Sequence, residues 1–291
     1  MASVFVIYLK ARYSLVMSEY HIKRLTGTLG AVVTGVDLSQ QLAPSLVEAL
    51  KREFFEHLVL FFSDQKIEDA DQYRFVSLFG DPYIHPLARL MGMTEARVER
   101  IVDSSESRPF QDRWHTDVSF DTSPPAIGTL RAIEIPAVGG DTLWASTRDA
   151  YDALPSALRE RINGMRAIHD SGAGEAFIEK IGRELTEQLR EAYPGTEHEI
   201  VQRHPVTGRR HLYVNRQFTR RIVGLDPTDS NDLLETLYRH IENPNLQLRH
   251  RWTEGDVGLW DERATWHFAA ADHYPQRREM ARMIVSSADE F

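Results

Sequence analysis

The sequence WHTDVSF, from Trp114 to Phe120, places a histidine and an aspartate at a spacing of two residues. Residues at this spacing point to the same side of an extended strand, so His115 and Asp117 can reach one metal ion while a distant third ligand closes the site. The triplet alone is weak evidence, because a chain of this composition contains roughly one His-x-Asp by chance. Its interpretation therefore depends on the rest of the chain.

The segment LWDERATWHFAAADHYPQRREMAR, from Leu259 to Arg282, supplies further candidates. A predicted strand that ends at Trp260 leads to a second isolated histidine, His267. Two histidines and one carboxylate on one face of a metal leave positions open for other ligands, which suits non-haem Fe(II) and oxygen chemistry. Arg278 follows His267, and an arginine on a neighbouring strand can bind the carboxylate of a 2-oxo acid that chelates the iron.

The composition limits the chemistry that such a site can use. With 291 residues, of which 42% are hydrophobic and 26% charged, the chain is typical of soluble globular proteins. It has no cysteine, so a metal must be held by histidines and carboxylates, and a reducing cytoplasm is the expected setting. The net charge of -9 argues against a nucleic-acid or membrane surface, although a small organic anion could bind where a few cations gather.

The N-terminal residues raise the question of a signal peptide. The apolar run Val4–Leu9 is short, its charges at Lys10 and Arg12 follow it instead of preceding it, and no cleavage site closes it. We interpret residues 1–16 as a non-native or disordered extension and residues 17–291 as a single domain, because the chain shows no repeat or linker. No apolar segment approaches the length of a membrane span.

The hydrophobic pattern predicts many short strands with helices between them. The predicted helices are Leu46–Leu58, Asp69–Phe79, Arg148–Met165, Ala176–Ala192 and Asn231–Ile241. The predicted strands lie within Ile22–Val36 and at Leu58–Phe62, Val98–Val102, Ile127–Ile135, Thr142–Ala145, Leu246–Trp252, Val257–Trp260 and Met280–Ser286. This order favours a mainly β protein, in which helices flank a sandwich or barrel and are inserted between its strands.

Three motifs together resemble the Fe(II)/2-oxoglutarate-dependent dioxygenases of the taurine dioxygenase and 2,4-D dioxygenase (TauD/TfdA) family. They are WHTDVSF, GGDTLWAS at Gly139–Ser146 and WDERATWHFAAADHYPQRR at Trp260–Arg278. Their order and spacing match the family from about Ile22 to about Ser286. The resemblance implies a double-stranded β-helix, or jelly roll, which agrees with the predicted strands. It also implies a homodimer or homotetramer, since family members commonly assemble in this way.

The resemblance implies a role for each motif residue. His115, Asp117 and His267 correspond to the iron ligands. Arg278 corresponds to the arginine that binds the distal carboxylate of 2-oxoglutarate, and Thr142 to the threonine that donates its hydroxyl to the same group, although it also fits an ordinary strand residue. The implied cofactors are Fe(II), 2-oxoglutarate as co-substrate and O2. The implied reaction couples decarboxylation of 2-oxoglutarate to succinate with hydroxylation of a C–H bond.

The resemblance extends partly to the substrate pocket. Taurine-type members hold a sulfonate with a histidine of an HP dipeptide and an arginine four residues after the 2-oxoglutarate arginine, and this chain has both, as His85 and Arg282. Two cations would favour a sulfonate, sulfate ester or carboxylate. The tyrosine and asparagine of the taurine pocket are replaced by Ala88 and Gln111. Taurine is therefore not favoured, and a larger or less polar anion is expected.

Two apolar residues complete the predicted pocket. Val118 directly follows a candidate metal ligand, and Phe218 corresponds to a family aromatic that can line the pocket, although core packing explains Phe218 equally well.

Three functions follow from these observations. The first is a dioxygenase that hydroxylates an alkylsulfonate or alkyl sulfate ester and releases sulfite or sulfate and an aldehyde. The second is the same enzyme class with an aryloxyalkanoate or other carboxylate as substrate. The third is a non-catalytic jelly-roll protein that binds a metal or ligand, which would require a metal site closed by protein ligands alone. No fourth histidine or acidic residue is obviously placed to close it.

Overall fold

The computed structural model describes residues 20–109 and 112–286. The predicted extension at residues 1–16 and the pocket candidate Gln111 lie outside the described residues, so both stay predictions. Within the described ranges, no helix has both the length and the apolar character needed to cross a bilayer.

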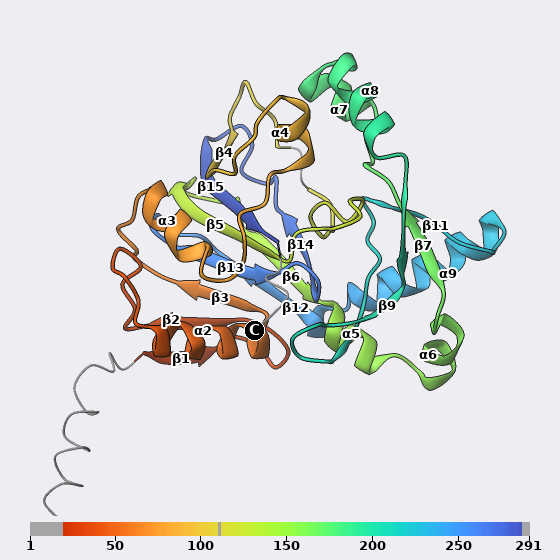
Figure 1. Cartoon of the computed structure of the whole chain (residues 1–291), viewed down its shortest axis with the longest axis horizontal. Coiled ribbons are helices and arrows are strands. Elements are labelled where there is room, and N and C mark those ends of the chain that lie inside the picture. Colours follow the sequence, from red (N-terminus) through yellow and green to blue (C-terminus); the bar gives the residue numbers. More distant parts are fainter. Residues whose placement is uncertain (1–19, 110–111, 287–291) are drawn as a thin grey trace, which may run out of the picture.

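A seven-stranded sheet forms one wall of the molecule (Figure 1). In pairing order its strands are β1 (His21–Arg24), β2 (Ala31–Thr34), β3 (Val59–Phe62), β13 (Val257–Asp261), β5 (Ile127–Glu134), β15 (Arg278–Val285) and β4 (Glu99–Asp103). Neighbouring strands are antiparallel except for β2 and β3, which are parallel. The last strand of the chain, β15, therefore lies between β5 and β4.

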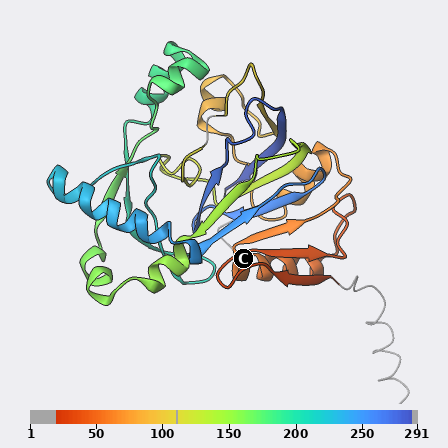
Figure 2. The same cartoon turned by 180° about the vertical axis from the view of Figure 1, so that it is seen from behind.

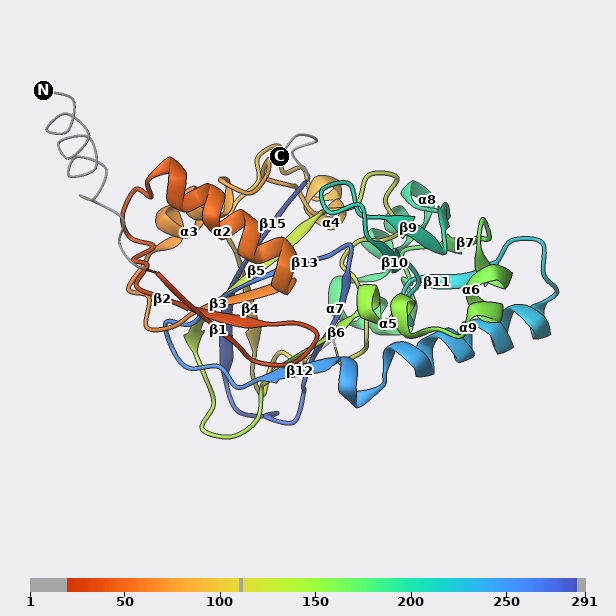
Figure 3. The ribbon, with the colours of Figure 1, turned by 90° about the horizontal axis from the view of Figure 1, so that it is seen from below.

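Two helices cover one face of this sheet (Figure 3). Helix α2 (Pro44–His57) has a proline in its first turn and buries Leu50 and Phe54. Helix α3 (Asp69–Val76) begins with a capping box and buries Phe75 in the same cluster. Burying these large side chains against apolar strand residues attaches the N-terminal part of the chain to the sheet.

A second sheet faces the other side of the large one. It contains β12 (Gln247–His250), β6 (Thr142–Ser146) and β14 (Thr265–Ala269), all antiparallel. The layer between the sheets contains Trp144, Trp252 and Trp260, and the ring of Trp144 contacts the rings of both others. Two facing sheets that enclose one core form a jelly roll, and the predicted core with flanking and inserted helices is confirmed.

A long insertion joins β6 to β12 and extends to the right of the jelly roll in Figure 1 and to its left in Figure 2, while its first helix contacts the C-terminal end of α2. Its helices are α5 (Thr147–Ala153), α6 (Ser156–Ile162), α7 (Glu175–Ile181), α8 (Arg183–Ala192), α9 (Pro227–Ile241) and the 3-10 helix η1 (Pro244–Leu246). Its strands are β7 (Arg166–His169), β8 (Thr196–Glu199), β9 (Val201–Arg203), β10 (Arg210–Leu212) and β11 (Thr219–Ile222). The insertion has its own core, in which α9 buries Leu233 and Leu237.

The structure corrects several sequence-based boundaries. The stretch Arg148–Met165 is divided into α5 and α6 at Pro155, because the residue before a proline avoids the helical conformation. The stretch Ala176–Ala192 is divided at Gly182, whose φ of 85° is incompatible with a continuous helix. Strands β7 to β11, strand β14 and the short helix α4 (Pro86–Leu90) were not predicted from the sequence.

Candidate active site

Backbone pairing brings the two candidate histidines together. His267 lies in β14, and His115 lies in the segment between β4 and β5. The N–H of His115 donates to the carbonyl oxygen of His267 (3.0 Å), and the N–H of His267 donates to the carbonyl oxygen of His115 (2.7 Å). Their ring centroids are consequently 4.1 Å apart. This pair of hydrogen bonds fixes the position of one ligand relative to the other.

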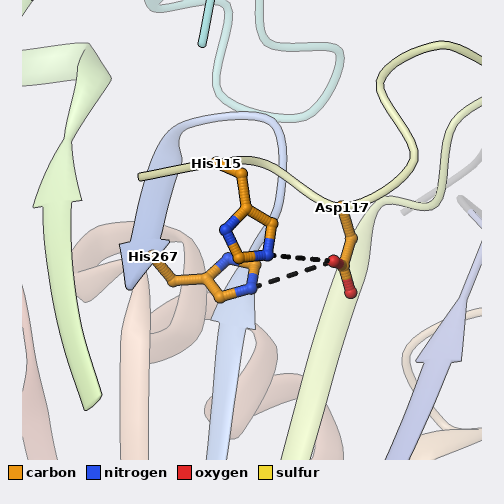
Figure 4. A group of neighbouring side chains, drawn as sticks. All are labelled: His115, Asp117 and His267. Carbon is orange, nitrogen blue, oxygen red and sulfur yellow. Dashed lines mark ion pairs between the residues drawn. The ribbon is translucent and has the colours of Figure 1, made fainter. Parts of the chain in front are cut away.

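The three candidate ligands converge on one point (Figure 4). Nε2 of His115 is 3.5 Å from Oδ1 of Asp117, and Nε2 of His267 is 3.8 Å from the same oxygen. One ligand atom from each residue lies within 4.8 Å of the other two, and all three side chains are buried. Two imidazoles and one carboxylate form a donor set that fits Fe(II) and leaves positions for a co-substrate and oxygen.

The WHTDVSF segment does not form the extended strand that its His-x-Asp spacing predicted. His115 makes only an isolated β-bridge, and the chain turns at Asp117–Phe120. Within this turn Val118 has a φ of 53°, which is uncommon for a β-branched residue. The strand prediction was wrong here, and the turn, together with the bridge, sets how Asp117 faces the two imidazoles.

The protonation states suit metal binding. Burial alone would raise the pKa of Asp117, but the neighbouring His115 and the positive charge of Arg282 hold this pKa well below its usual range. Burial, with the neighbouring His115, lowers the pKa of His267 to about 3. Nδ1 of His115 lies 2.7 Å from the carbonyl oxygen of Arg113, so this nitrogen carries the proton and Nε2 is left for a metal.

Glu262 contacts two of the candidate ligands, Asp117 and His267, and was not identified from the sequence. Its Oε2 accepts a hydrogen bond from the backbone N–H of Asp117 (2.9 Å), and its Oε1 accepts one from Trp260 Nε1 (2.7 Å). Burial and the nearby charge of Asp117 raise the pKa of Glu262. Oε2 of Glu262 also lies 3.8 Å from Nδ1 of His267. Glu262 therefore holds the turn that presents Asp117.

Arg278 and Thr142 line the same cavity as the metal ligands, and Arg278 contacts Gly140, which lies two residues before Thr142. Arg278 is 3% exposed, and its Nε donates to the carbonyl oxygen of Gly140 (3.0 Å). Its Nη2 has no hydrogen-bond partner among the described residues. The hydroxyl of Thr142 accepts a hydrogen bond from Trp252 Nε1 (2.9 Å), which leaves its own proton for another acceptor. A buried donor without a partner is costly, so this guanidinium is suited to bind an anion.

All predicted site residues that the structure describes line one cavity of about 530 Å³. They are His85, His115, Asp117, Val118, Thr142, Phe218, His267, Arg278 and Arg282. The far wall is apolar and comes from α4, α7 and α8 and from the residues next to them. It includes Leu87, Met91, Met93, Phe177, Ile181 and Leu189. The cavity thus extends from a polar floor to an apolar wall.

His85 contributes a donor without a positive charge. It caps α4, and its Nδ1 accepts a hydrogen bond from the N–H of Leu87 (3.2 Å), so Nε2 carries the proton. Burial and the charge of Arg282 lower the pKa of His85 to about 4. This shift favours the neutral form of His85, so Arg282 is the charged member of the predicted pair and His85 its neutral donor.

Arg282 is paired with two carboxylates. Its Nη2 donates to Oε2 of Glu99 (2.8 Å), and its Nη1 lies 3.4 Å from Oδ2 of Asp117. Burial alone would raise the pKa of Glu99, but the charge of Arg282 lowers it, so Glu99 is ionised. Glu99 also lines the cavity and was not identified from the sequence, because nothing in its local pattern shows which residue faces it.

Comparison with known proteins gives a consistent result. The family model described as "Taurine catabolism dioxygenase TauD, TfdA family" matches residues 21–284. The chain is 35% identical to an alkylsulfatase from Acinetobacter baylyi, over 92% of this chain and 85% of that protein. It is 34% identical to an alpha-ketoglutarate-dependent sulfate ester dioxygenase from Pseudomonas putida, over 92% of this chain and 90% of that protein.

The fold comparison points the same way. The crystal structure of a taurine dioxygenase from Burkholderia xenovorans superposes with a TM-score of 0.77 and 32% sequence identity, covering 92% of this chain and 89% of that one. The likeness therefore includes the jelly roll and the insertion, and is not limited to the motifs.

Proposed function

The chain belongs to the TauD/TfdA family of 2-oxoglutarate-dependent dioxygenases, and from this premise we propose that it hydroxylates an alkyl sulfate ester or an alkylsulfonate. The carbon that carries the sulfur-containing group receives the hydroxyl, and the product then separates into an aldehyde and sulfate or sulfite. One O2 and one 2-oxoglutarate are consumed, and succinate and carbon dioxide leave. The alternative of a non-catalytic jelly-roll protein is not supported by relatives that are named as dioxygenases.

The arrangement of the cavity carries this proposal. Arg282 is a guanidinium whose Nη1 lies 3.4 Å from the candidate ligand Asp117, so an anion bound to Arg282 would sit beside the metal. The apolar wall formed by α4, α7 and α8 can accept an alkyl chain on the other side. A molecule with an anionic head and an apolar tail would then present the carbon next to its head group to the metal centre.

The remaining residues are assigned roles in binding and orientation. His115, Asp117 and His267 would hold Fe(II), which supplies the oxidative chemistry when it is bound with 2-oxoglutarate and O2. Arg278 and Thr142 would bind the distal carboxylate of 2-oxoglutarate. Their preorganised donors need no rearrangement to receive this anion.

Two further residues shape the pocket around the substrate. Val118 and Phe218 pack with Phe120 and Tyr83 in one apolar cluster, and both face the cavity. We assign them to the exclusion of water from the reacting carbon. His85 would donate its Nε2–H to the head group, and Ala88 leaves room where the taurine pocket has a tyrosine.

The names of the relatives support a sulfur-containing substrate. An alkylsulfatase and a sulfate ester dioxygenase are both about one third identical to this chain over most of its length. The absence of cysteine supports action in a reducing compartment such as the cytoplasm. Assembly as a homodimer or homotetramer stays a prediction that a native mass measurement can test.

The test is oxygen-dependent succinate formation with a panel of substrates. Hexyl sulfate, hexane-1-sulfonate, hexanoate, an aryloxyacetate and taurine are each incubated with the protein, Fe(II), 2-oxoglutarate and O2. We expect hexyl sulfate or hexane-1-sulfonate to stimulate succinate formation most, with hexanal and sulfate or sulfite in equal amounts, and taurine to stimulate it least. Turnover of the carboxylates alone would support the second function, a dioxygenase that acts on an aryloxyalkanoate or other carboxylate. An absence of turnover with every compound would contradict the proposal.

A further inference from the structure

The pairing of β4 with β15 places Glu99 directly opposite Arg282. Opposite charges at facing positions of an antiparallel pair stabilise each other, and here Nη2 of Arg282 donates to Oε2 of Glu99 at 2.8 Å. Both residues line the substrate cavity. The arginine that is expected to bind the substrate's head group is therefore already neutralised by a carboxylate in the same cavity.

The other cations of the cavity cannot replace Arg282 in this role. Arg278 lies at the position assigned to 2-oxoglutarate, where its Nε is held by Gly140. Lys180 donates to Ser107 Oγ (2.8 Å) and to the carbonyl oxygen of Arg108 (3.2 Å). Arg100 also lines the cavity, but it is paired with Asp69 (2.9 Å) and Glu279 (3.2 Å). His85 is a neutral donor. An anionic head group beside the metal must therefore use the guanidinium that Glu99 already holds.

The hydrogen-bond partners of the three guanidinium nitrogens of Arg282 show how a bound anion would compete with Glu99. Nη1 faces Asp117 and Nη2 faces Glu99, whereas Nε has no hydrogen-bond partner among the described residues. A bidentate interaction with a sulfate or sulfonate needs two neighbouring N–H groups of the guanidinium. Any such pair that includes Nη2 must compete with Glu99 for this nitrogen. The Glu99 side chain is 30% exposed and that of Arg282 is 16% exposed, so the carboxylate has more solvent to turn toward.

We propose that Glu99 is a specificity-determining residue, which competes with the anionic head group of the substrate for the guanidinium of Arg282 and so weakens the binding of anions in this cavity. The inference rests on the proposed function for the choice of anion. Asp117 also faces Arg282, but a metal bound to Asp117 would offset its charge, whereas Glu99 is ion-paired among the described residues with Arg282 alone.

The substitution Glu99→Gln tests this competition. It keeps the length of the side chain and an oxygen that can accept from Nη2, but removes the charge. Glu134→Gln is the matched control, because Glu134 accepts from Nε of Arg277 (2.8 Å) on a strand of the same sheet and is not among the residues that line the cavity. Glu99→Asp is a second variant that retains the charge. Circular dichroism and Tm establish that each variant is folded.

Binding is measured by calorimetry without O2, on protein loaded with Fe(II) and 2-oxoglutarate. The probes are hexyl sulfate, hexane-1-sulfonate, hexanoate and, as a neutral molecule, 1-hexanol. In the wild type an anion must displace the charged hydrogen bond between Glu99 and Arg282, whereas in Glu99→Gln it displaces only a weaker hydrogen bond to a neutral amide. We therefore expect Glu99→Gln to lower the Kd of the anions about tenfold. The Kd of 1-hexanol should be unchanged, and Glu99→Asp and Glu134→Gln should not gain affinity for the anions.

The outcomes separate this inference from the proposed function. An unchanged or higher Kd of the anions in Glu99→Gln overturns the role of Glu99. An equal gain in affinity for 1-hexanol overturns it as well, and so does an absence of anion binding in both the wild type and the variant. Anion binding that appears only in Glu99→Gln supports it. Failure of the wild type to form succinate with any of these anions refutes the substrate class alone, because the affinities are compared without turnover.

Discussion

Nε of Arg278 donates a hydrogen bond to the carbonyl oxygen of Gly140, so strand β15 and the glycine turn that precedes β6 hold one guanidinium between them. A Cβ on Gly140 would lie 3.0 Å from Cδ of Arg278, and Gly140 has a φ of 75°. The GGDT motif therefore has a structural reason in this chain. It lets the backbone approach the arginine that we assign to 2-oxoglutarate.

Gly140→Ala should raise the KM for 2-oxoglutarate about tenfold, because the added methyl displaces the Arg278 side chain. The KM for the organic substrate should change much less. Gly164→Ala is the control, since Gly164 has the same φ of 75° but no atom within 4 Å of an added Cβ. Steady-state kinetics with 2-oxoglutarate and the organic substrate varied in turn measure both KM values. An equal rise in the KM for 2-oxoglutarate in Gly140→Ala and Gly164→Ala would show that backbone strain alone is responsible.

Asp117→Ala should weaken binding of Mn(II), used as an oxygen-stable substitute for Fe(II), by more than about 100-fold. The fold should be retained, because Asp117 interacts mainly with the other site residues. Electron paramagnetic resonance measures free Mn(II), and far-UV circular dichroism reports the fold. Asp152→Ala, which removes an exposed aspartate paired with Arg209, should bind Mn(II) like the wild type. Unaltered Mn(II) binding in Asp117→Ala would remove the metal assignment.

Arg278→Ala and Arg282→Ala should affect different substrates. Loss of a buried charged partner costs about 2–5 kcal/mol, so each variant should lose roughly 100-fold in kcat/KM for the molecule that it binds. We expect this loss for 2-oxoglutarate in Arg278→Ala and for the organic anion in Arg282→Ala. His85→Ala should resemble Arg282→Ala but be milder, since a neutral donor is lost. Matched losses for both molecules in either arginine variant would contradict this division of roles.

His211 should make the folded state sensitive to acid. Burial lowers its pKa to about 4, and neither ring nitrogen has a hydrogen-bond partner among the described residues. Between the unfolded pKa, about 6.5, and pH 4 the unfolded chain binds more protons, so the free energy of unfolding falls as the pH falls, by about 2 kcal/mol for this residue between pH 7.5 and pH 5. His211→Leu should remove this part of the dependence. Urea unfolding at pH 5 and pH 7.5 measures it, and equal pH dependence in both proteins would refute the assignment.

The parts of the site that could be predicted from the sequence are those fixed by local motifs. His115, Asp117 and His267 were predicted together from the family resemblance and do converge, although strand β14 was not predicted and the WHTDVSF segment forms a turn instead of a strand. Glu99 and Glu262 could not be predicted in this way. Their importance depends on the pairing of β4 with β15 and on burial behind Asp117, and neither is visible in the residues that surround them.

The fold shows the same limit. The strands of the jelly roll were largely predicted, because several of them, such as β2, β3 and β13, are apolar runs. The strands of the insertion were missed, since β7 to β11 are three or four residues long and contain many charged or polar side chains, as in the TEHE of β8. Such segments become strands through pairing with distant partners and not through their own propensity.

The insertion between β6 and β12 has a practical consequence. The candidate metal ligands and Arg278 belong to the jelly roll and its loops, whereas Phe177, Ile181 and Leu189 of the apolar wall come from α7 and α8 within the insertion. The α7–α8 hairpin is thus a replaceable module. An engineer could exchange it to accept longer, shorter or branched tails while the oxidising machinery keeps its own scaffold, and one catalyst could be adapted to a series of surfactant-like molecules.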